Sequence, residues 1–211
     1  MRKNSSSTDY IAYALDESPE NSAELPDGYY FKTWLPRILD PLPPTLGPKS
    51  IIWTVSHFCG VLGNRFFRIV FVCKGNRIVH RSCVFPEHFR WSFMKVNDLQ
   101  IGATWTDPAQ RCKGLASATL AHITSTMAEP GRRFWYISRE QNAASRHACE
   151  YVGFKLVAHL ERHSILEIPL TSWLVVTKGQ PEETARGRTT ALTNKYHWPS
   201  SSSYVARRNH Q

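Results

Sequence analysis

The pattern of hydrophobic and polar positions in the middle of the chain predicts three β-strands in succession. Residues 66–73 form a mostly apolar run, and 78–85 form a second one after the turn 74–77, KGNR. Two such runs on either side of a short turn with Gly and Asn predict a β-hairpin. A third strand is predicted over 98–106, because Asp107-Pro108 is typical of a turn that ends it.

The periodicity changes to that of a helix after this turn. Apolar side chains recur at the spacing of one helical face, and they are Ala116, Leu120, Ile123 and Met127. Pro130 and Gly131 end this helix. The chain therefore passes from a strand through a loop into a helix.

A second strand and helix follow. Residues 133–138 are aromatic and β-branched, which favours a strand. Asn142 is a good N-cap and Gly153 a good C-terminal stop for a helix between them, and 154–160 is predicted to be another strand. The order β-β-β-α-β-α-β combines hairpins with crossover helices, so we expect an α/β fold with a mixed sheet.

Length and composition indicate one folded core with polar ends. The 211 residues are 42% hydrophobic and 12% aromatic, which is enough for a single substantial core. Residues 1–28 and 178–211 are polar and are expected to be weakly ordered. We divide the chain into an N-terminal segment 1–48 that leads into the core through a proline-rich loop, a domain 49–177, and a basic, Ser-rich tail 178–211.

Targeting and metal-binding signals are not visible in the sequence. The apolar stretch 51–73 contains Arg65 and Arg68, which make it a poor membrane span. The basic N-terminus is not followed by an apolar segment, so no secretory signal is visible. Five scattered cysteines without a CxxC pair argue against both disulfides and a zinc site. We expect a cytoplasmic protein with reduced thiols and no bound metal.

Positive charge is concentrated in two parts of the chain. The net charge is +9, and residues 49–95 hold eight Lys and Arg against one acidic residue. Residues 171–211 hold six against two. A basic segment can bind nucleic acid, an anionic membrane surface or a phosphorylated small molecule, or can serve only to keep the protein soluble. Charge alone does not separate these alternatives.

The loop before the first predicted helix has the composition of an anion site. It runs from Pro108 to Ala116 and contains Arg111, Lys113 and Gly114. The first N–H groups of a helix have no partner within the helix, so they can donate hydrogen bonds to a phosphate. Glycine lets the backbone approach closely, and the two cations add attraction. An ordinary basic helix start has the same features, so this alternative stays open.

Two segments in this region resemble motifs of the GNAT superfamily of acyl-CoA N-acyltransferases. The segment 98–116, which ends in RCKGLA, resembles motif A, whose pattern is Arg/Gln-x-x-Gly-x-Gly/Ala; NAAS at 142–145 and YVGF at 151–154 resemble motif B. The resemblance implies a mixed, mostly antiparallel sheet with splayed central strands, flanked by helices. Strands 98–106 and 133–138 would splay apart, with the pantetheine arm of the coenzyme between them.

By position, the resemblance makes one loop the binding site for the pyrophosphate of acetyl-CoA. This loop consists of Arg111, Cys112, Lys113, Gly114, Leu115 and Ala116. Asn142 and Ser145 would lie near the pantetheine or the adenosine phosphates, although helix capping by itself also explains Asn142. The family usually has Gly where this chain has Cys112.

The resemblance also suggests acid–base groups. Many family members have a Tyr four residues before the Gly-Phe pair, as the acid that protonates the leaving CoA thiolate, and Cys149 stands there in this chain. A thiol has an ordinary pKa of about 8.5 and could act in this way, whereas a small core cysteine is the alternative. Asp98 is the candidate base, with a strand-entry turn as its alternative. His80 and His88 are reserve candidates without support from the motifs.

We therefore expect an N-acyltransferase that transfers an acetyl group from acetyl-CoA directly to a primary amine. The basic segment 49–95 suggests a small anionic acceptor such as a nucleotide-linked amino sugar. The stretch 85–102 also resembles GNAT proteins encoded with bacterial surface-polysaccharide enzymes. The alternative, favoured by the missing motif B tyrosine, is a non-catalytic module that binds CoA or, through the basic tail, nucleic acid.

Overall fold

The computed structural model describes residues 9–16, 19, 21, 23–37, 51–60, 66–87, 93–164 and 172–179. Within them the strands are β1 (Asp9–Leu15), β2 (Tyr29–Trp34), β3 (Arg68–Lys74), β4 (Arg77–Pro86), β5 (Leu99–Thr106), β6 (Phe134–Arg139), β7 (Lys155–Ser164) and β8 (Ser172–Gly179). The helices are α1 (Ile51–Phe58), the short 3-10 helix η2 (Pro108–Gln110), α2 (Leu115–Thr126) and α3 (Ala143–Val152). The proline-rich stretch 41–48, His88 and residues 180–211 lie outside the described residues.

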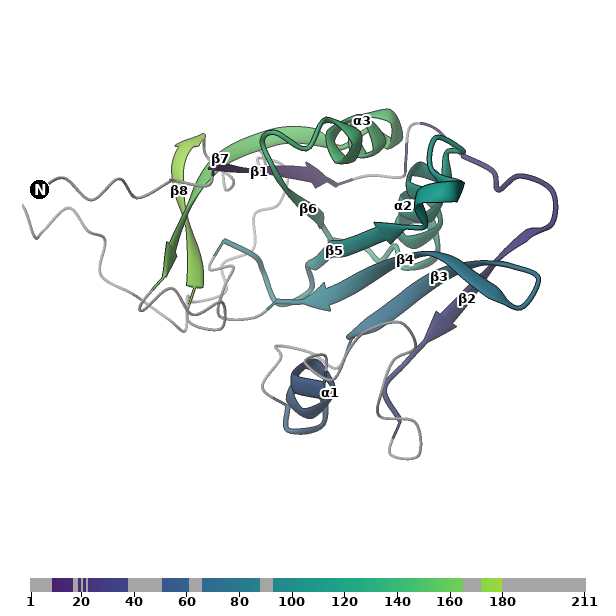
Figure 1. The fold of residues 1–211 in the computed structure, drawn as a ribbon. Helices are drawn as coiled ribbons and strands as arrows, with labels where there is room; N and C mark the ends of the chain where they lie inside the picture. Colours follow the sequence, from purple (N-terminus) through teal and green to yellow (C-terminus); the bar gives the residue numbers. More distant parts are fainter. Residues whose placement is uncertain are drawn as a thin grey trace, which may run out of the picture.

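The eight described strands form one sheet in the order β2-β3-β4-β5-β6-β1-β7-β8 (Figure 1). β5 and β6 are parallel, and the other neighbouring pairs are antiparallel. The predicted hairpin consists of β3 and β4, and the three later predicted strands correspond to β5, β6 and β7. The expected mixed, mostly antiparallel sheet is confirmed.

One strand inside the sheet comes from the N-terminal region. β1 pairs with β6 on one side and with β7 on the other, and Ile11, Ala12 and Tyr13 are at most 2% exposed. The polar composition of residues 1–28 predicts weak order, whereas 9–15 form this strand. A strand covered on both faces is apolar without alternation, and the polar residues around this short run mask it. Strands from both sides of residue 49 therefore belong to one sheet.

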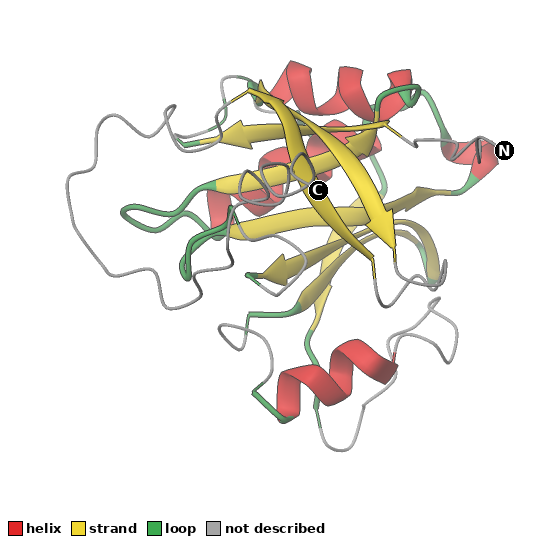
Figure 2. Ribbon diagram, turned by 90° about the vertical axis from the view of Figure 1, so that its left-hand side faces the viewer, coloured by secondary structure: helices red, strands yellow, loops and turns green. Residues whose placement is uncertain are grey.

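Helices α2 and α3 cover one face of the sheet (Figures 1 and 2). Leu120 and Ile123 of α2 share a core cluster with Cys149 and Val152 of α3 and with residues of the sheet. In each helix these apolar positions lie three residues apart, so they share the helical face that turns towards the strands. The two helices predicted from periodicity are confirmed.

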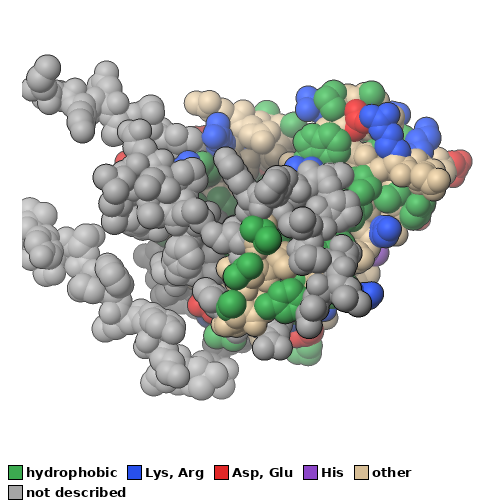
Figure 3. All heavy atoms as spheres, turned by 60° about the horizontal axis from the view of Figure 1, so that its bottom comes forward, with side chains coloured by type: hydrophobic (Ala, Val, Ile, Leu, Met, Phe, Trp, Pro, Cys, Tyr) green, Lys and Arg blue, Asp and Glu red, His purple; other side chains and the backbone are tan. Residues whose placement is uncertain are grey.

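Helix α1 contacts the opposite face through Trp53. The centroid of the Trp53 ring lies 4.7 Å from that of Phe85 and 6.3 Å from that of Phe67. Ile51, Val55 and Phe58 are exposed, and hydrophobic side chains are visible on this side of the molecule (Figure 3). No helix in the described part of the chain is long and apolar enough to span a membrane.

The central strands β5 and β6 separate after three residue pairs. Leu99–Ile101 pair with Phe134–Tyr136, and beyond them β5 continues beside β4 while β6 continues beside β1 (Figure 1). In β5, Ala103 and Thr104 together stand opposite Ser82 of β4, and Ala103 has a φ of 48°. Such a β-bulge bends its strand and increases the local twist. The expected splayed central strands are confirmed.

Candidate functional site

The loop from the end of β5 to α2 turns through two left-handed residues. Asp107 begins it: its Oδ1 accepts a hydrogen bond from the Ala109 N–H (3.0 Å), and its Oδ2 accepts one from Arg77 (2.8 Å). After η2, Cys112 and Gly114 have φ values of 61° and 71°. These turns bring the chain back over the sheet, where α2 begins at Leu115.

The start of α2 presents free backbone donors. The Ala118 N–H donates to the Gly114 carbonyl (2.9 Å) as the first helical bond. The N–H groups of Leu115, Ala116 and Ser117 precede this bond and have no partner within the helix. Gly114 provides no capping side chain, and a Cβ at this position would meet no atom within 4 Å. An anion can therefore approach the positive end of the helix dipole.

Side chains from β2 and β3 lie beside Lys113 and Gln110 of this loop. Lys113 Nζ donates to Gln110 Oε1 (2.7 Å) and to the Tyr29 hydroxyl (3.3 Å), and Tyr29 also donates to Gln110 Oε1 (2.6 Å). Lys74 Nζ lies 5.0 Å from the centroid of the Tyr29 ring. Burial raises the pKa of Tyr29, but the hydrogen bond and charge of Lys113 and the charge of Lys74 outweigh it, so the pKa is lowered. No sequence motif includes Tyr29, so the sequence did not predict its place beside this loop.

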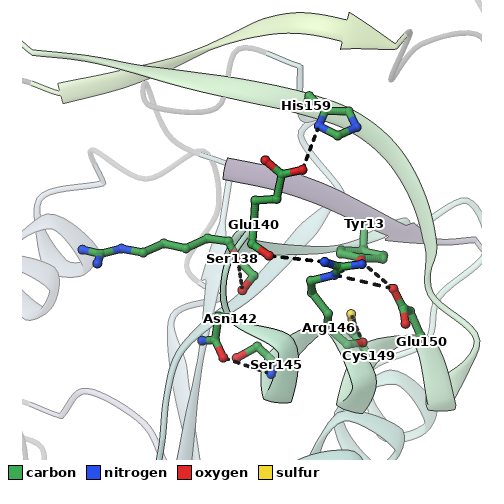
Figure 4. A network of polar contacts seen from close by, with 10 residues as sticks. Tyr13, Ser138, Glu140, Asn142, Ser145, Arg146, Cys149, Glu150 and His159 are labelled. Atoms are coloured by element: carbon green, nitrogen blue, oxygen red, sulfur yellow. Dashed lines mark hydrogen bonds and ion pairs between the residues drawn. The ribbon is translucent and has the colours of Figure 1, made fainter. Parts of the chain in front are cut away.

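Asn142 and Ser145 mark the start of α3 (Figure 4). Asn142 Oδ1 accepts a hydrogen bond from the Ser145 N–H (3.2 Å), as an N-cap does. Asn142 is exposed and Ser145 is half-buried. Ser117, in the first turn of α2, donates to the Ala148 carbonyl of α3 (3.4 Å) and so connects the two helices. The N-cap prediction is confirmed, and the proposed ligand contact stays a prediction.

A chain of polar side chains runs from β4 to β5. It lies next to the place where β5 and β6 separate, which we call the splay. Thr104 Oγ1 lies 3.0 Å from Ser82 Oγ, and His80 Nε2 lies 3.3 Å from the same Ser82 oxygen. His80 Nδ1 lies 2.7 Å from Thr106 Oγ1. Burial, and secondly the charge of Arg81, lower the pKa of His80 to about 4. His80 is therefore a neutral imidazole near pH 7, held in a hydrogen-bonded network.

Tyr136 stands where the splay begins. It is the last residue of β6 that pairs with β5, and its ring packs edge-on to Phe154 with the centroids 6.3 Å apart. The pKa of Tyr136 is raised, chiefly by burial; hydrogen bonds with the hydroxyls of Ser145 and Thr104 act to lower it, and the charge of nearby Cys149 acts to raise it. The sequence motifs gave no signal for Tyr136 beyond its place in an aromatic strand.

Cys149 lies in the core beside a polar cluster of α3 (Figure 4). Its side chain is fully buried, Sγ donates to the Arg146 carbonyl (3.2 Å), and burial, followed by the charge of Glu150, raises its pKa to about 12. The Tyr13 hydroxyl donates to Glu150 Oε1 (2.6 Å) and accepts from Arg146 Nε (3.3 Å). Because its S–H already donates to a carbonyl of its own helix, this position gives no support to Cys149 as the proton donor for a CoA thiolate.

Asp98 lies at the other end of β5, where β5 and β6 are still paired. Its carboxylate accepts hydrogen bonds from the Lys95 N–H (2.9 Å), the Arg133 N–H (3.3 Å) and Trp135 Nε1 (2.9 Å). It is 2% exposed. These contacts join the starts of β5 and β6 and separate Asp98 from the loop that begins after Thr106. The role of base predicted for Asp98 gains no support from this position.

Comparison with known proteins gives matches in fold. No protein-family model and no curated protein matches the chain. A tandem GNAT protein from the clavulanic acid biosynthesis pathway has a TM-score of 0.52 and 13% identity, over 83% of this chain and 55% of its own. A GCN5-related N-acetyltransferase from Sphaerobacter thermophilus has a TM-score of 0.51 and 15% identity, over 74% of this chain and 50% of its own.

The match therefore spans about half the length of these two solved chains. At such low identities the similarity concerns the arrangement of the elements. It agrees with the eight-stranded mixed sheet, the splayed central strands and the helices on its faces. The described part of the chain has the fold of the GNAT acyl-CoA N-acyltransferases.

Proposed function

We propose that the protein is an N-acyltransferase that transfers an acetyl group from acetyl-CoA to a primary amine. The single observation that best supports this function is the loop 111–116. It joins the diverging end of β5 to the open N-terminus of α2, beside the place where β5 and β6 separate. A phosphate site next to an opened sheet suits a long ligand with a pyrophosphate at one end and a reactive thioester at the other.

The loop would bind the pyrophosphate mainly through backbone N–H groups at Leu115, Ala116 and the residues before them. Arg111 and Lys113 would add positive charge. The pantetheine arm would enter between β5 and β6, where strand N–H and C=O groups no longer pair with the neighbouring strand. Asn142 and Ser145, at the start of α3, would lie along the same path.

The chemistry needs no covalent enzyme intermediate. A neutral amine attacks the thioester carbonyl carbon, a backbone N–H stabilises the developing oxyanion, and CoA leaves as a thiolate. Holding both reactants in the splay accounts for much of the acceleration, because positioning makes the reaction effectively unimolecular. Cys112 and Cys149 need not act as nucleophiles.

The acceptor we propose is small and anionic. Residues 49–95 carry eight Lys and Arg against one acidic residue, and they include β3 and β4 beside the splayed strands. Such a positive potential attracts an anionic amine, for example a nucleotide-linked amino sugar of the kind used for surface polysaccharides.

Release of free thiol from acetyl-CoA with a panel of primary amines tests this function. We expect turnover that depends on the amine, with phosphorylated or carboxylated amines preferred over neutral ones. Tight CoA binding without turnover on any amine would contradict the enzyme and favour the binding module. Binding of nucleic acid that is lost when residues 180–211 are removed would favour a module that acts through its basic tail.

A further inference from the structure

The proposed transfer breaks the bond between the acetyl carbonyl carbon and the CoA sulfur, and the electron pair stays on the sulfur. A side chain that donates a proton to this sulfur lowers the barrier of the step. With the pyrophosphate at the start of α2 and the pantetheine between β5 and β6, the thioester would reach the point where the two strands meet. The groups at that point are therefore candidate acids.

Tyr136 occupies this point. Ile101 and Tyr136 are the last pair that joins β5 to β6. The Tyr136 side chain lies in the core cluster shared with α2 and α3, and its ring is fixed against Phe154. Thr104 of β5 and Ser145 of α3 contribute hydroxyls that interact with the Tyr136 hydroxyl. Its O–H is thus surrounded by groups from β5 and α3, the two elements that border the opening.

Two other side chains near Tyr136, those of Tyr13 and Cys149, could also donate a proton, and neither borders β5. Tyr13 is on β1, which pairs with the side of β6 away from β5, and its proton is already donated to Glu150 at 2.6 Å. Cys149 is fully buried and donates its S–H to the Arg146 carbonyl within α3. The serine and threonine hydroxyls around the splay bind protons too tightly to act as acids, so they can only pass a proton on.

We propose that Tyr136 is the general acid of this reaction, and the assignment rests on the proposed acetyltransferase function. The amine nitrogen bonds to the carbonyl carbon, the C–S bond breaks, and the Tyr136 hydroxyl gives its proton to the sulfur. The nitrogen loses one proton to water, and the Tyr136 phenolate regains one from water. The products are the amide and CoA with a free thiol.

The hydroxyl of Thr104 connects Tyr136 to a fixed chain of hydrogen bonds. From Thr104 Oγ1 the chain passes to Ser82 at 3.0 Å, to His80 at 3.3 Å and to Thr106 at 2.7 Å. Ser82 and His80 are fully buried, whereas the two threonines are half-buried. This series of hydrogen bonds therefore holds the Thr104 hydroxyl next to Tyr136. Its far end, Thr106, is partly exposed, so protons from solvent can enter the series there.

The test compares Tyr136→Phe with the matched variant Tyr13→Phe, which removes a hydroxyl from the directly opposed residue of the neighbouring strand. Thiol release and CoA binding by calorimetry are measured on folded protein. We expect Tyr136→Phe to lower kcat by about 10²-fold while the Kd for CoA changes by less than about threefold. Tyr13→Phe should leave kcat within about threefold of wild type.

A kcat near that of wild type for Tyr136→Phe overturns the assignment and leaves the proposed function standing. A wild-type protein without turnover on any amine overturns the function and the assignment together. If Tyr136→Phe does not fold, Thr104→Val removes the hydroxyl next to Tyr136 at a half-buried position. We then expect a lower kcat with unchanged CoA affinity, and an unchanged kcat overturns the assignment.

Discussion

Single residues of the loop 111–116 show why the GNAT pattern has glycines there. Cys112 has a φ of 61° and Gly114 a φ of 71°. Glycine adopts this left-handed conformation without strain, whereas other residues do so at a cost of about 1–2 kcal/mol. The pattern usually has Gly at the position of Cys112, and the backbone gives the physical reason. This chain keeps glycine at the second left-handed position, directly before α2.

Gly114 allows the charge of the site to be tested with little disturbance. A Cβ there meets no atom within 4 Å, and Asp and Asn tolerate left-handed backbone better than most residues. Gly114→Asp should place a negative charge beside the proposed pyrophosphate site and raise the Kd for CoA at least about tenfold, which is about 1.4 kcal/mol. Calorimetry on the folded variant measures this.

Gly114→Asn is the matched control, since it has the same shape without the charge. Its Kd should stay much closer to that of wild type. Equal affinities for CoA in the Asp and Asn variants would mean that no phosphate lies near position 114.

Substitution of Cys149 distinguishes a role in core packing from a role as proton donor. Because its side chain is fully buried and its thiol pKa is about 12, we expect Cys149→Ala to lose about 1–2 kcal/mol of stability through a small cavity. The kcat of the folded fraction should stay within about threefold of wild type. Thermal melts and thiol release measure the two effects. A fall in kcat of about 10²-fold without loss of stability would restore Cys149 as the acid.

At the scale of elements, β1 joins two parts of the sheet that are far apart in sequence. It lies between β6 and β7 and pairs with both. The Tyr13 hydroxyl also bonds to Glu150 of α3, 137 positions along the chain. Without β1, two strands would each lose a partner, and the buried N–H and C=O groups on those edges would lack hydrogen bonds.

Deletion of residues 1–15 should therefore abolish cooperative folding. Circular dichroism during heating should show no sharp transition, because a buried strand of the sheet is removed. Deletion of residues 1–8 is the control: pairing begins at Asp9, so its Tm should be close to that of wild type. A sharp transition at the wild-type Tm after the longer deletion would show that the sheet does not need β1.

At the scale of the whole molecule, buried His80 makes stability depend on pH. The folded pKa is about 4, and the unfolded value is about 6.5. Above pH 6.5 the imidazole is neutral in both states, and the full stability is present. Between about pH 6.5 and 4 only the unfolded chain gains the proton, so the free energy of unfolding falls as pH falls, by up to about 3 kcal/mol.

Denaturant unfolding at several pH values between 7.5 and 4.5 measures this loss. His80→Gln keeps polar atoms in the network but cannot gain a charge, so its free energy of unfolding should fall less over the same range. The comparison of slopes removes the contribution of carboxylates, which both proteins share. Identical slopes in the two proteins would show that His80 titrates normally in the folded state.

Local sequence patterns predicted the elements from β3 to β7. The hairpin, the helices α2 and α3, the Asn142 cap and the Gly153 stop follow from patterns that extend over a few neighbouring residues. Neighbouring residues also form the candidate anion loop, which is why a motif could point to it. Strands β1, β2 and β8 and helix α1 were missed, because they are short and lie among polar or proline-rich residues.

The surroundings of the splay, by contrast, depend on tertiary structure. The bulge at Ala103 and the place of β1 depend on pairing between distant strands. The same pairing brings His80, Thr104 and Tyr136 together, although no local pattern relates them. It also moves Asp98 to the closed end of the strands. Hydrophobic and capping patterns act over one or two turns, whereas a site between strands depends on which segments pair, and the sum of long-range contacts decides that.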